Sequence, residues 1–515
     1  MASASTFLSH PNPQANDVVS SAICQFKSCS FASQSTLFGS KFASKSLSLH
    51  TATTRPACAS DSEPISASHS HQTFDVLIIG AGIIGLTIAR QFLIGSDLSV
   101  AVIDKSVPCS GATGAGQGYI WMAHKTPGSD LWDFGLRSQR LWEDLTESLS
   151  EQGLDPLQLL GWKKTGSLLV GRTPEESDML KRRVKLLCEA GLRAEYLSAI
   201  DLLVKEPELM VDKDTGAAFL PDDCQLDARR AVEFLEKGNR HYSSKGRYAE
   251  FYNDPVISLL RSGGSGEVEA MKTSRNILYT KKAIVVAAGC WSGSLMCDLL
   301  RESEVVLDVP VKPRKGHLLV LENFNSFQLN HGLMEVGYVD HQTAIPLPNI
   351  STSGLLDHDG QTLSVSMTAT MDTAGNIVLE LCMIILFYGI FPPFPLSLSL
   401  SLGSSRQFAG FCSELEESII SRIWDRAGEF FPKLREKSLS DFSKSREVRV
   451  GLRPYMPDGK PVIGPVPGVA NVFLATGHEG GGLSMALGTA EMLADMVIGN
   501  PEKVNSAPFA VHGRC

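Results

Sequence analysis

The sequence FDVLIIGAGIIGLTIARQF, residues 74–92, decides the fold. It opens with an apolar run led by β-branched residues, which predicts a buried strand, and it continues into a segment with helical apolar spacing. Between the two, Gly80, Gly82 and Gly85 stand in GxGxxG spacing. A second apolar run follows and ends at Asp104, 19 residues after Gly85. The sequence therefore predicts a β–α–β unit with an acidic residue at the end of its second strand.

Each part of this unit suits a dinucleotide. Gly80 permits the tight turn, Gly82 lets the backbone approach a pyrophosphate, and Gly85 allows the helix to pack close to the strand. The amino terminus of the helix offers N–H groups and a positive dipole end to the phosphates. Asp104 would accept hydrogen bonds from ribose hydroxyls. These residues predict a Rossmann-like nucleotide site and leave NAD(P) and FAD both open.

Length and composition place the chain among globular proteins of several domains. It has 515 residues, of which 43% are hydrophobic and 20% charged, values that fit neither a collagen-like repeat nor a coiled coil. The net charge of −9 and the absence of a basic run argue against nucleic acid as a partner. The 11 cysteines show no CxxC or Cys/His ligand spacing, so we expect no metal site.

Residues 1–72 have the composition of a transit peptide. Residues 1–60 hold one acidic residue, Asp17, and many serines, and they lack the unbroken apolar stretch of a secretory signal. A Ser-rich, acid-poor segment predicts the plastid, and hence the chloroplast stroma, over the mitochondrion. The alternative is an ordinary disordered tail, because the segment has little apolar periodicity.

Further glycine-rich junctions favour FAD over NAD(P). The small-residue loop SGATGAGQG at 110–118 directly follows the ribose acid, and it suits a longer cofactor that needs more close backbone contacts. The buried strands that begin at 283 and 472 also end in small residues, and the second leads into a helix. Three such junctions predict one nucleotide domain assembled from discontinuous segments.

At this point the sequence resembles the FAD-dependent oxidoreductases of the D-amino-acid oxidase type, particularly the glycine oxidase and D-amino-acid dehydrogenase branch, as a plant member with a plastid address. The resemblance covers roughly residues 73–500. The stretches that carry it are IIGAGIIGL at 78–86, SGATGAGQG at 110–118, TGSLLV at 165–170, VVAAGCWS at 285–292, GLRPYMPDGKPVIGP at 451–465 and ATGHEGGGLSMALGTAEMLADMV at 475–497.

The resemblance implies an α/β fold in which a Rossmann-like FAD-binding domain is interleaved with an α+β substrate domain built on a mixed or antiparallel sheet. The FAD-binding domain would take residues 73–145, 216–305 and 446–500. The substrate domain would take residues 146–215 and 306–445, which leaves 501–515 as a tail.

The resemblance also implies a set of FAD-binding residues. Asp104 stands where the family usually has Glu, and the backbone of Val256 would contact the adenine side. Residues 446–460 contain no Cys, so we expect non-covalent, dissociable FAD. The implied set is Gly80, Gly82, Ile83, Ile84, Gly85, Asp104, Lys105, Thr113, Gly114, Gly116, Gly118, Val256, Ala288, Gly289, Trp291, Gly477, His478, Gly480, Gly481, Gly482 and Leu483.

Arg453 is the residue that we expect to meet the substrate. A guanidinium binds a carboxylate through two charge-assisted hydrogen bonds, and the position of Arg453 is similar to that of the carboxylate-binding arginine of the family. The alternative is an ordinary ion pair. Tyr338 and Tyr455 are candidate pocket hydroxyls or packing residues, and His478 is either a general base or a hydrogen-bonding spacer.

The implied reaction is FAD-dependent oxidation of a small amino acid or a secondary amine acid. A hydride passes from Cα to flavin N5, and the imino acid is hydrolysed to a keto acid and ammonia or an amine. The electron acceptor would be O₂, a quinone or another carrier, and the pattern is compatible with a homo-oligomer. A catalytically silent FAD-binding protein with an assembly or scaffold role is the alternative. An NAD-dependent dehydrogenase is a third possibility, and it would show no flavin spectrum.

One stretch does not fit the family pattern. Residues 381–402, LCMIILFYGIFPPFPLSLSLSL, carry no charge, and their length could span a bilayer. Pro392, Pro393 and Pro395 would break a spanning helix, so we expect no integral membrane span. Removing residues 380–402 restores a strand followed by a turn, and codons for Leu, Ser, Phe and Pro can consist wholly of pyrimidines. We therefore interpret 380–402 as translated intron sequence.

Overall fold

The structure is a computed structural model. The predicted transit segment up to residue 69, Tyr338 and residues 387–402 of the interpreted insertion lie outside the described residues. Of residues 70, 355–356, 362–366 and 381–386 only the backbone is described. The described ranges are 70–262, 267–301, 303–337, 355–356, 362–372, 375–386 and 408–515.

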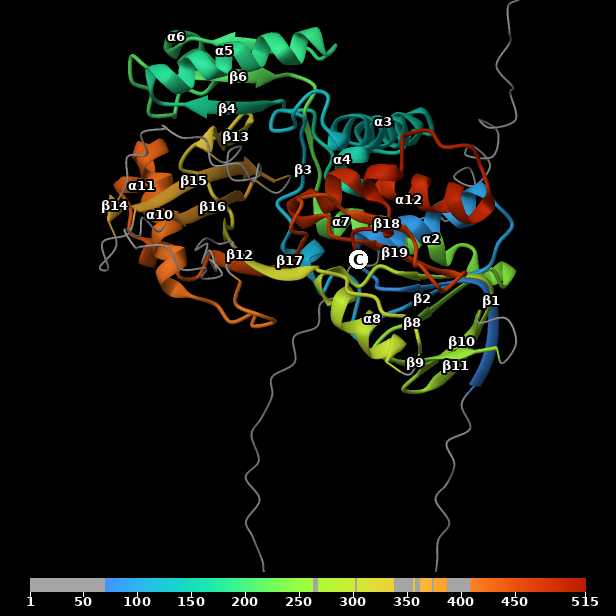
Figure 1. Cartoon of the computed structure of the whole chain (residues 1–515). Helices are drawn as coiled ribbons and strands as arrows, with labels where there is room; N and C mark the ends of the chain where they lie inside the picture. The colour runs from blue at the N-terminus through green and yellow to red at the C-terminus, as the bar shows by residue number, and fades with distance from the viewer. Residues whose placement is uncertain are drawn as a thin grey trace, which may run out of the picture. The chain divides into compact units, whose positions relative to one another are not determined.

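The glycine-rich segment lies in a sheet that has eight strands among the described residues (Figure 1). β1 (Ser70–Ile79) pairs in parallel with β2 (Val100–Ile103), and α2 (Ile83–Gly95) connects them, as the sequence predicts. β9 (Val256–Arg261) and β10 (Val268–Thr273) extend the sheet from β11. The order of the other strands is β18 (Val462–Pro465), β19 (Val472–Thr476), β11 (Asn276–Val286), β1, β2 and β8 (Tyr248–Phe251).

The backbone itself requires two glycines of the motif. Gly80 follows β1 with a φ of +119°, and a Cβ there would lie 2.3 Å from the carbonyl oxygen of Ala287. A Cβ on Gly85 would lie 1.9 Å from the carbonyl oxygen of Gly80. The first turn of α2 therefore approaches the end of β1 as closely as it does because neither position carries a side chain.

We expect Gly85→Ala to lower the free energy of unfolding by about 1–3 kcal/mol or more, the usual cost of overpacking. Gly82→Ala is the matched control, because a Cβ on Gly82 would meet only the Thr113 hydroxyl, at 3.2 Å. Chemical unfolding of the two variants measures the difference. Equal stability of both variants would contradict the packing argument.

Helices cover the first sheet. α2 packs against α7 (Ala228–Arg240) and α12 (Gly482–Ile498), and α12 also packs against α3 (Asp130–Glu151). Two shorter helices, α4 (Pro156–Leu160) and α8 (Ser292–Leu300), belong to the same part of the chain's fold. The last residues also pack there: Phe509 and Val511 are buried, and the Arg514 guanidinium binds both carboxylate oxygens of Asp458.

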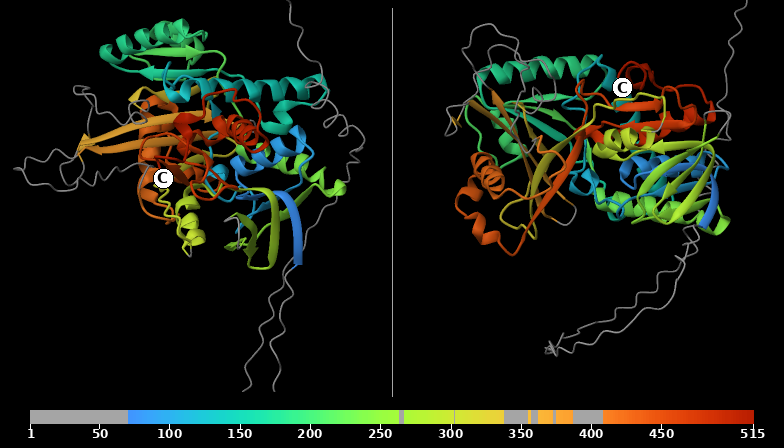
Figure 2. Two further views of the ribbon diagram at one scale, coloured as in Figure 1. Left: turned by 45° about the vertical axis from the view of Figure 1, so that its right-hand side comes forward. Right: turned by 60° about the horizontal axis from the view of Figure 1, so that its bottom comes forward.

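A second sheet, of nine strands among the described residues, lies beside the first in both views of Figure 2. β14 (Leu355–Leu356) pairs with β15 at its side. The order of the other strands is β17 (Arg446–Tyr455), β12 (Lys312–Leu321), β16 (Ile377–Leu386), β15 (Thr362–Met371), β13 (Gly332–Glu335), β4 (Ser167–Gly171), β6 (Gly216–Leu220) and β5 (Glu195–Leu197).

Two strands of this second sheet fall within residue ranges that the sequence interpretation assigned to the FAD-binding domain. The sequence interpretation gave residues from 216 and from 446 to the FAD-binding domain, whereas β6 and β17 both pair within the second sheet. A run of alternating or apolar residues predicts a strand but does not say which sheet it joins. The small two-stranded sheet of β3 (Tyr119–Ile120) and β7 (Cys224–Gln225) is separate from both.

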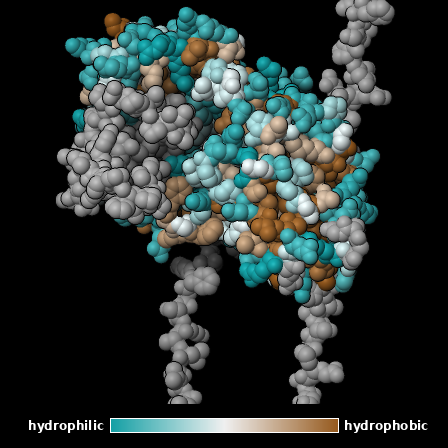
Figure 3. All heavy atoms as spheres, viewed as in Figure 1, coloured by the Kyte–Doolittle hydropathy of each residue, from teal (hydrophilic) through white to brown (hydrophobic). Residues whose placement is uncertain are grey.

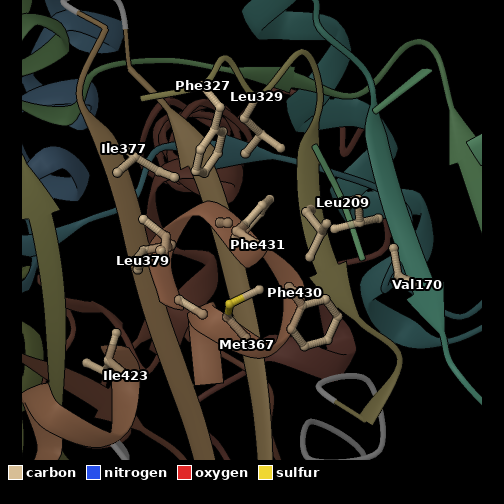
Figure 4. Packing of buried hydrophobic residues seen from close by; sticks show 14 of the residues in the cluster. Val170, Leu209, Phe327, Leu329, Met367, Ile377, Leu379, Ile423, Phe430 and Phe431 are labelled. Atoms are coloured by element: carbon tan, nitrogen blue, oxygen red, sulfur yellow. The ribbon is translucent and has the colours of Figure 1, made fainter. Parts of the chain in front are cut away.

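The second sheet packs one face against α10 (Glu417–Phe430) and α11 (Pro432–Arg435), while α5 (Pro174–Glu189) and α6 (Ala199–Lys205) lie by β4, β5 and β6. Figure 4 shows Met367 of β15 and Ile377 and Leu379 of β16 in the core with Phe430 and Phe431. Successive residues of a strand point to opposite faces, so the residue after Leu379 faces away from this core.

Hydrophilic and hydrophobic residues are mixed over the coloured part of the face in Figure 3, and a hydrophobic spot at its top lies over α6. This helix exposes Ile200, Leu203 and Val204. Within the described residues, no helix is both long enough and apolar enough to cross a membrane.

Candidate functional site

The two sheets share a cavity of about 520 Å³. On the first sheet's side it is lined by the loop after β1, by η2 (Ala112–Ala115), by η4 (Gly289–Trp291) and by the loop before α12. Residues of β12, β16 and β17 line it on the other side. The loops at the carboxyl ends of parallel strands thus open onto the cavity, which is the usual place for a ligand in such a sheet.

Sixteen of the predicted FAD-binding residues line this cavity: Gly80, Gly82, Ile83, Ile84, Asp104, Lys105, Thr113, Gly116, Val256, Ala288, Gly289, Trp291, His478, Gly480, Gly482 and Leu483. The others lie close to neighbouring backbone or side chains that would block a Cβ. For example, a Cβ on Gly118 would lie 1.9 Å from the carbonyl oxygen of Leu226. The predicted residues absent from the lining are Gly85, Gly114, Gly118, Gly477 and Gly481.

Asp104 holds the glycine loop in place. Its carboxylate accepts hydrogen bonds from the backbone N–H groups of Ala81 and Ser106, each at 2.7 Å. The backbone N–H of Ile83, in the first turn of α2, donates to the Thr113 hydroxyl at 3.1 Å. The two loops that the sequence singled out are therefore joined at the start of the helix.

The geometry of this part of the cavity fits FAD. The N-cap of α2 is Gly82, which has no side chain to cap the helix, and the first turn contains no acidic residue. The positive end of the helix dipole and backbone N–H groups therefore face the cavity, where they suit an anionic pyrophosphate. Asp104 lies beside this turn, at the position that suits ribose hydroxyls.

An aromatic stack that the sequence interpretation missed completes the first side of the cavity. The ring of Phe411 stacks on Trp291 with centroids 5.8 Å apart, and Lys105 Nζ lies 4.0 Å from the Trp291 ring centroid. Phe411 also lines the cavity. Sequence spacing gives no signal for such a contact between residues that are 120 positions apart.

Arg453 lies on β17 and lines the cavity from the second sheet, as predicted. Its guanidinium donates to the carboxylate of Glu380, and both side chains are largely buried. The guanidinium lies across Gly316 of β12, where a Cβ would come within 2.1 Å of Arg453 Nη1. A glycine inside a strand can mark such a close approach, so Gly316 was a signal that the sequence interpretation did not use.

A second buried arginine–glutamate pair lies beside the first. Arg314 of β12 stands directly opposite Arg453 in the antiparallel register, and its Nη1 donates to Glu479 at 2.5 Å. Tyr455 does not line the cavity. Its ring lies 4.8 Å from the Arg314 guanidinium carbon, which is the packing role that the sequence left open beside that of a pocket hydroxyl.

His478 lies in the loop before α12 and is almost fully buried. Its Nε2 hydrogen-bonds the Thr489 hydroxyl at 2.8 Å, and this hydroxyl also donates to the carbonyl oxygen of Met485. Burial lowers the pKa of His478 to about 3. The imidazole is therefore neutral at pH 7, and the contact with Thr489 favours the hydrogen-bonding spacer over the general base.

Two buried histidines make stability depend on pH. Burial, with Lys315 nearby, lowers the pKa of His317 to about 4, whereas an unfolded His titrates near 6.5. Below about pH 6 the unfolded chain binds protons that the folded chain does not, so stability falls as the pH falls. We expect a loss of about 1.4 kcal/mol per pH unit for each histidine.

Urea unfolding of the wild type and of His478→Gln at pH 7, 6 and 5 measures this effect. The amide of the introduced glutamine can take the place of the histidine Nε2 and donate to Thr489 but does not titrate, so the variant should lose one histidine's share of the pH slope. An unchanged slope would contradict the neutral, buried state of His478.

The chain belongs to the DAO family of FAD-dependent oxidoreductases, because the family model matches residues 75–496. A glycine oxidase of Geobacillus kaustophilus (strain HTA426) is 23% identical over 441 residues, which are 85% of this chain and 96% of the relative. A D-amino acid dehydrogenase of Vibrio atlanticus (strain LGP32) is 25% identical over 352 residues, which are 68% of each chain.

Solved structures match the same fold. The crystal structure of the glycine oxidase from Geobacillus kaustophilus has a TM-score of 0.65 and 20% identity, and the match covers 86% of this chain and 100% of that one. An iminodiacetate oxidase from Chelativorans sp. BNC1 has a TM-score of 0.60 and 22% identity, with 84% and 98% covered. The predicted family, the mixed α/β fold and FAD are thereby confirmed, and FAD-dependent oxidation of amino acids or amines is the activity at the level of the family.

Proposed function

We propose that this chain oxidises a small amino acid or a secondary amine acid to an imino acid, which water then hydrolyses to a keto acid and ammonia or an amine. One observation carries the proposal: the cavity that the glycine loops line on one side contains Arg453 on the other. Bound FAD supplies the two-electron acceptor at this place. Arg453 then binds the substrate carboxylate and fixes the orientation of the neighbouring carbon.

In the folded chain Arg453 makes an ion pair with Glu380, so the proposed role requires the substrate carboxylate to take the place of the Glu380 carboxylate. The pairing indicates the chemical group that this side of the cavity binds. Arginine presents five N–H donors in a fixed fork, so it can hold a carboxylate in one orientation better than a lysine can.

The named relatives agree in the class of substrate. Glycine oxidase, D-amino acid dehydrogenase and iminodiacetate oxidase are all named after an amino acid or a related amine acid. We propose that FAD is bound without a covalent link, and acid precipitation of the purified protein tests this point. All the flavin should then appear in the supernatant.

Anaerobic reduction of the bound flavin tests the proposed function. Glycine, sarcosine, D-amino acids, proline and opines are added one at a time, and bleaching of the visible flavin absorbance is followed. Bleaching by at least one of them, with release of the matching keto acid, supports the proposal. Full FAD occupancy without bleaching by any of them would favour the silent flavoprotein instead.

We also propose that the functional chain lacks residues 380–402. Leu379 packs in the core of the second sheet, and Glu380, the next residue, binds Arg453 in the cavity. Glu380 would therefore compete with the carboxylate of a substrate. In the shortened chain Gly403 follows Leu379 directly, so that no carboxylate stands at this position and the residues from 403 would take the place of 380–386 in β16, next to β15. Sequencing of cDNA across the junction tests the proposal.

A further inference from the structure

The ion pair of Arg314 with Glu479 lies beside Arg453, and the proposed function does not use it. Arg314 and Arg453 are directly opposite each other on β12 and β17, so their side chains leave the same face of the sheet. Gly316, two residues after Arg314 and hence on that same face, lines the cavity. Arg453 binds Glu380, and Arg314 binds Glu479, which also lines the cavity.

The backbone of Glu479 has an unusual conformation. Its φ is +45°, in the left-handed region that favours glycine, although glycines stand directly after it in the loop. This conformation is unfavourable for a residue that carries a Cβ. Residues held in such a conformation are concentrated at functional sites, where the surrounding structure fixes them. Here the contact with Arg314 fixes the side chain of Glu479.

Arg314 is itself held firmly. Its side chain is 4% exposed, and its guanidinium carbon lies 4.8 Å from the ring of Tyr455 and 5.6 Å from that of Phe408. The side chain of Glu479 is more accessible, at 19%. A carboxylate offers about four lone-pair positions, and the bond from Arg314 Nη1 uses one of them. Arg314 thus holds the carboxylate of a residue that lines the cavity and keeps part of its surface accessible.

We propose that Glu479 binds the amine of the substrate, with Arg314 as its positioning residue. This inference rests on the proposed function and specifies its substrate as a zwitterion. The cavity then presents a cation, Arg453, to the carboxylate and an anion, Glu479, to the ammonium group. Hydroxy acids and simple carboxylic acids carry only the first of these two groups.

Ligand binding to the holoenzyme under anaerobic conditions tests the inference. Two pairs of probes differ in the amine alone: glycine with acetate, and D-alanine with propionate. The dissociation constants of the carboxylic acids, and of an amino acid that leaves the flavin oxidised, are measured by perturbation of the flavin spectrum, and that of an amino acid that reduces the flavin is taken from the concentration dependence of the bleaching rate. For Glu479→Gln we expect glycine or D-alanine to bind about 10- to 100-fold more weakly, as for the loss of a charge-assisted hydrogen bond, with acetate and propionate unchanged.

Glu479→Gln leaves the buried Arg314 without its carboxylate and can destabilise the fold, so a second variant controls for this effect. Arg314→Met combined with Glu479→Gln removes both charges and should show the same selective loss. Arg314→Met alone should weaken amino-acid binding, and Arg314→Lys should restore part of it, because a lysine can still hold the carboxylate. Glu380→Gln is the matched control for a cavity glutamate, and it should not weaken the amino acids selectively.

Equal weakening of both members of a probe pair, or no weakening of either, in both Glu479 variants would overturn the inference. Arg453→Met separates this result from a failure of the proposed function. It should weaken amino acids and carboxylic acids alike. If it weakens neither, the proposed role of Arg453 fails, whereas a selective loss in the Glu479 variants would still support the amine site.

Discussion

Arg453→Met is expected to lower kcat/KM for the substrate amino acid by about 10²- to 10³-fold. The variant removes the cation that pairs with the substrate carboxylate, and truncating one partner of a buried charge pair costs about 2–5 kcal/mol. The loss should lie in binding and in flavin reduction, while the content of FAD stays that of the wild type. Stopped-flow reduction of the flavin under anaerobic conditions measures both the rate and its dependence on substrate concentration.

The single variant leaves Glu380 buried without its cation, which can destabilise the fold on its own. Arg453→Met with Glu380→Gln removes both charges and controls for this effect. Arg453→Lys keeps a cation but loses the planar fork, so its kcat/KM should be intermediate. Undiminished turnover in the double variant would refute the role of Arg453.

Deleting residues 380–402 is expected to raise kcat/KM by about 10²-fold, because it removes a carboxylate that is tethered next to Arg453 at a high effective concentration. The full chain and the shortened chain should bind FAD equally. Steady-state assays of both chains with the amino acid that bleaches the flavin measure the ratio.

Glu380→Gln in the full chain separates the effect of the charge from that of the other deleted residues. If the carboxylate is the cause, this variant should recover a large part of the activity of the shortened chain. A tryptic peptide that joins Leu379 to Gly403 is expected from the native protein. A native peptide that contains residues 391–400, or a shortened chain without higher activity, would refute the proposal.

The sequence predicts the nucleotide half of the site well, because its signals are local. The spacing of Gly80, Gly82 and Gly85 reports a turn and a helix within six residues, and Asp104 follows after one more strand. The same local pattern repeats before α12. Each motif therefore predicts its own local conformation, and the family resemblance identifies FAD as the cofactor that the motifs bind together.

The substrate half is less predictable, because its contacts join distant residues. Arg314 and Glu479 are 165 positions apart, and their pairing depends on the register of β12 against β17. Tyr455 follows Arg453 by two residues and leaves the same face, yet it packs on Arg314 because the strand continues beyond the cavity. Alternation along a strand predicts the face of a side chain but not where a ligand site ends.

The order of strands in the first sheet has a consequence for biosynthesis. β1 and β2 leave the ribosome early, but β19 and the loop before α12, which complete the cavity, lie at residues 472–482. A nascent chain can bury the early strands long before it can close the flavin pocket. We therefore expect FAD to be acquired only after nearly the whole polypeptide has been translated, and apoprotein shortened by premature termination not to retain it.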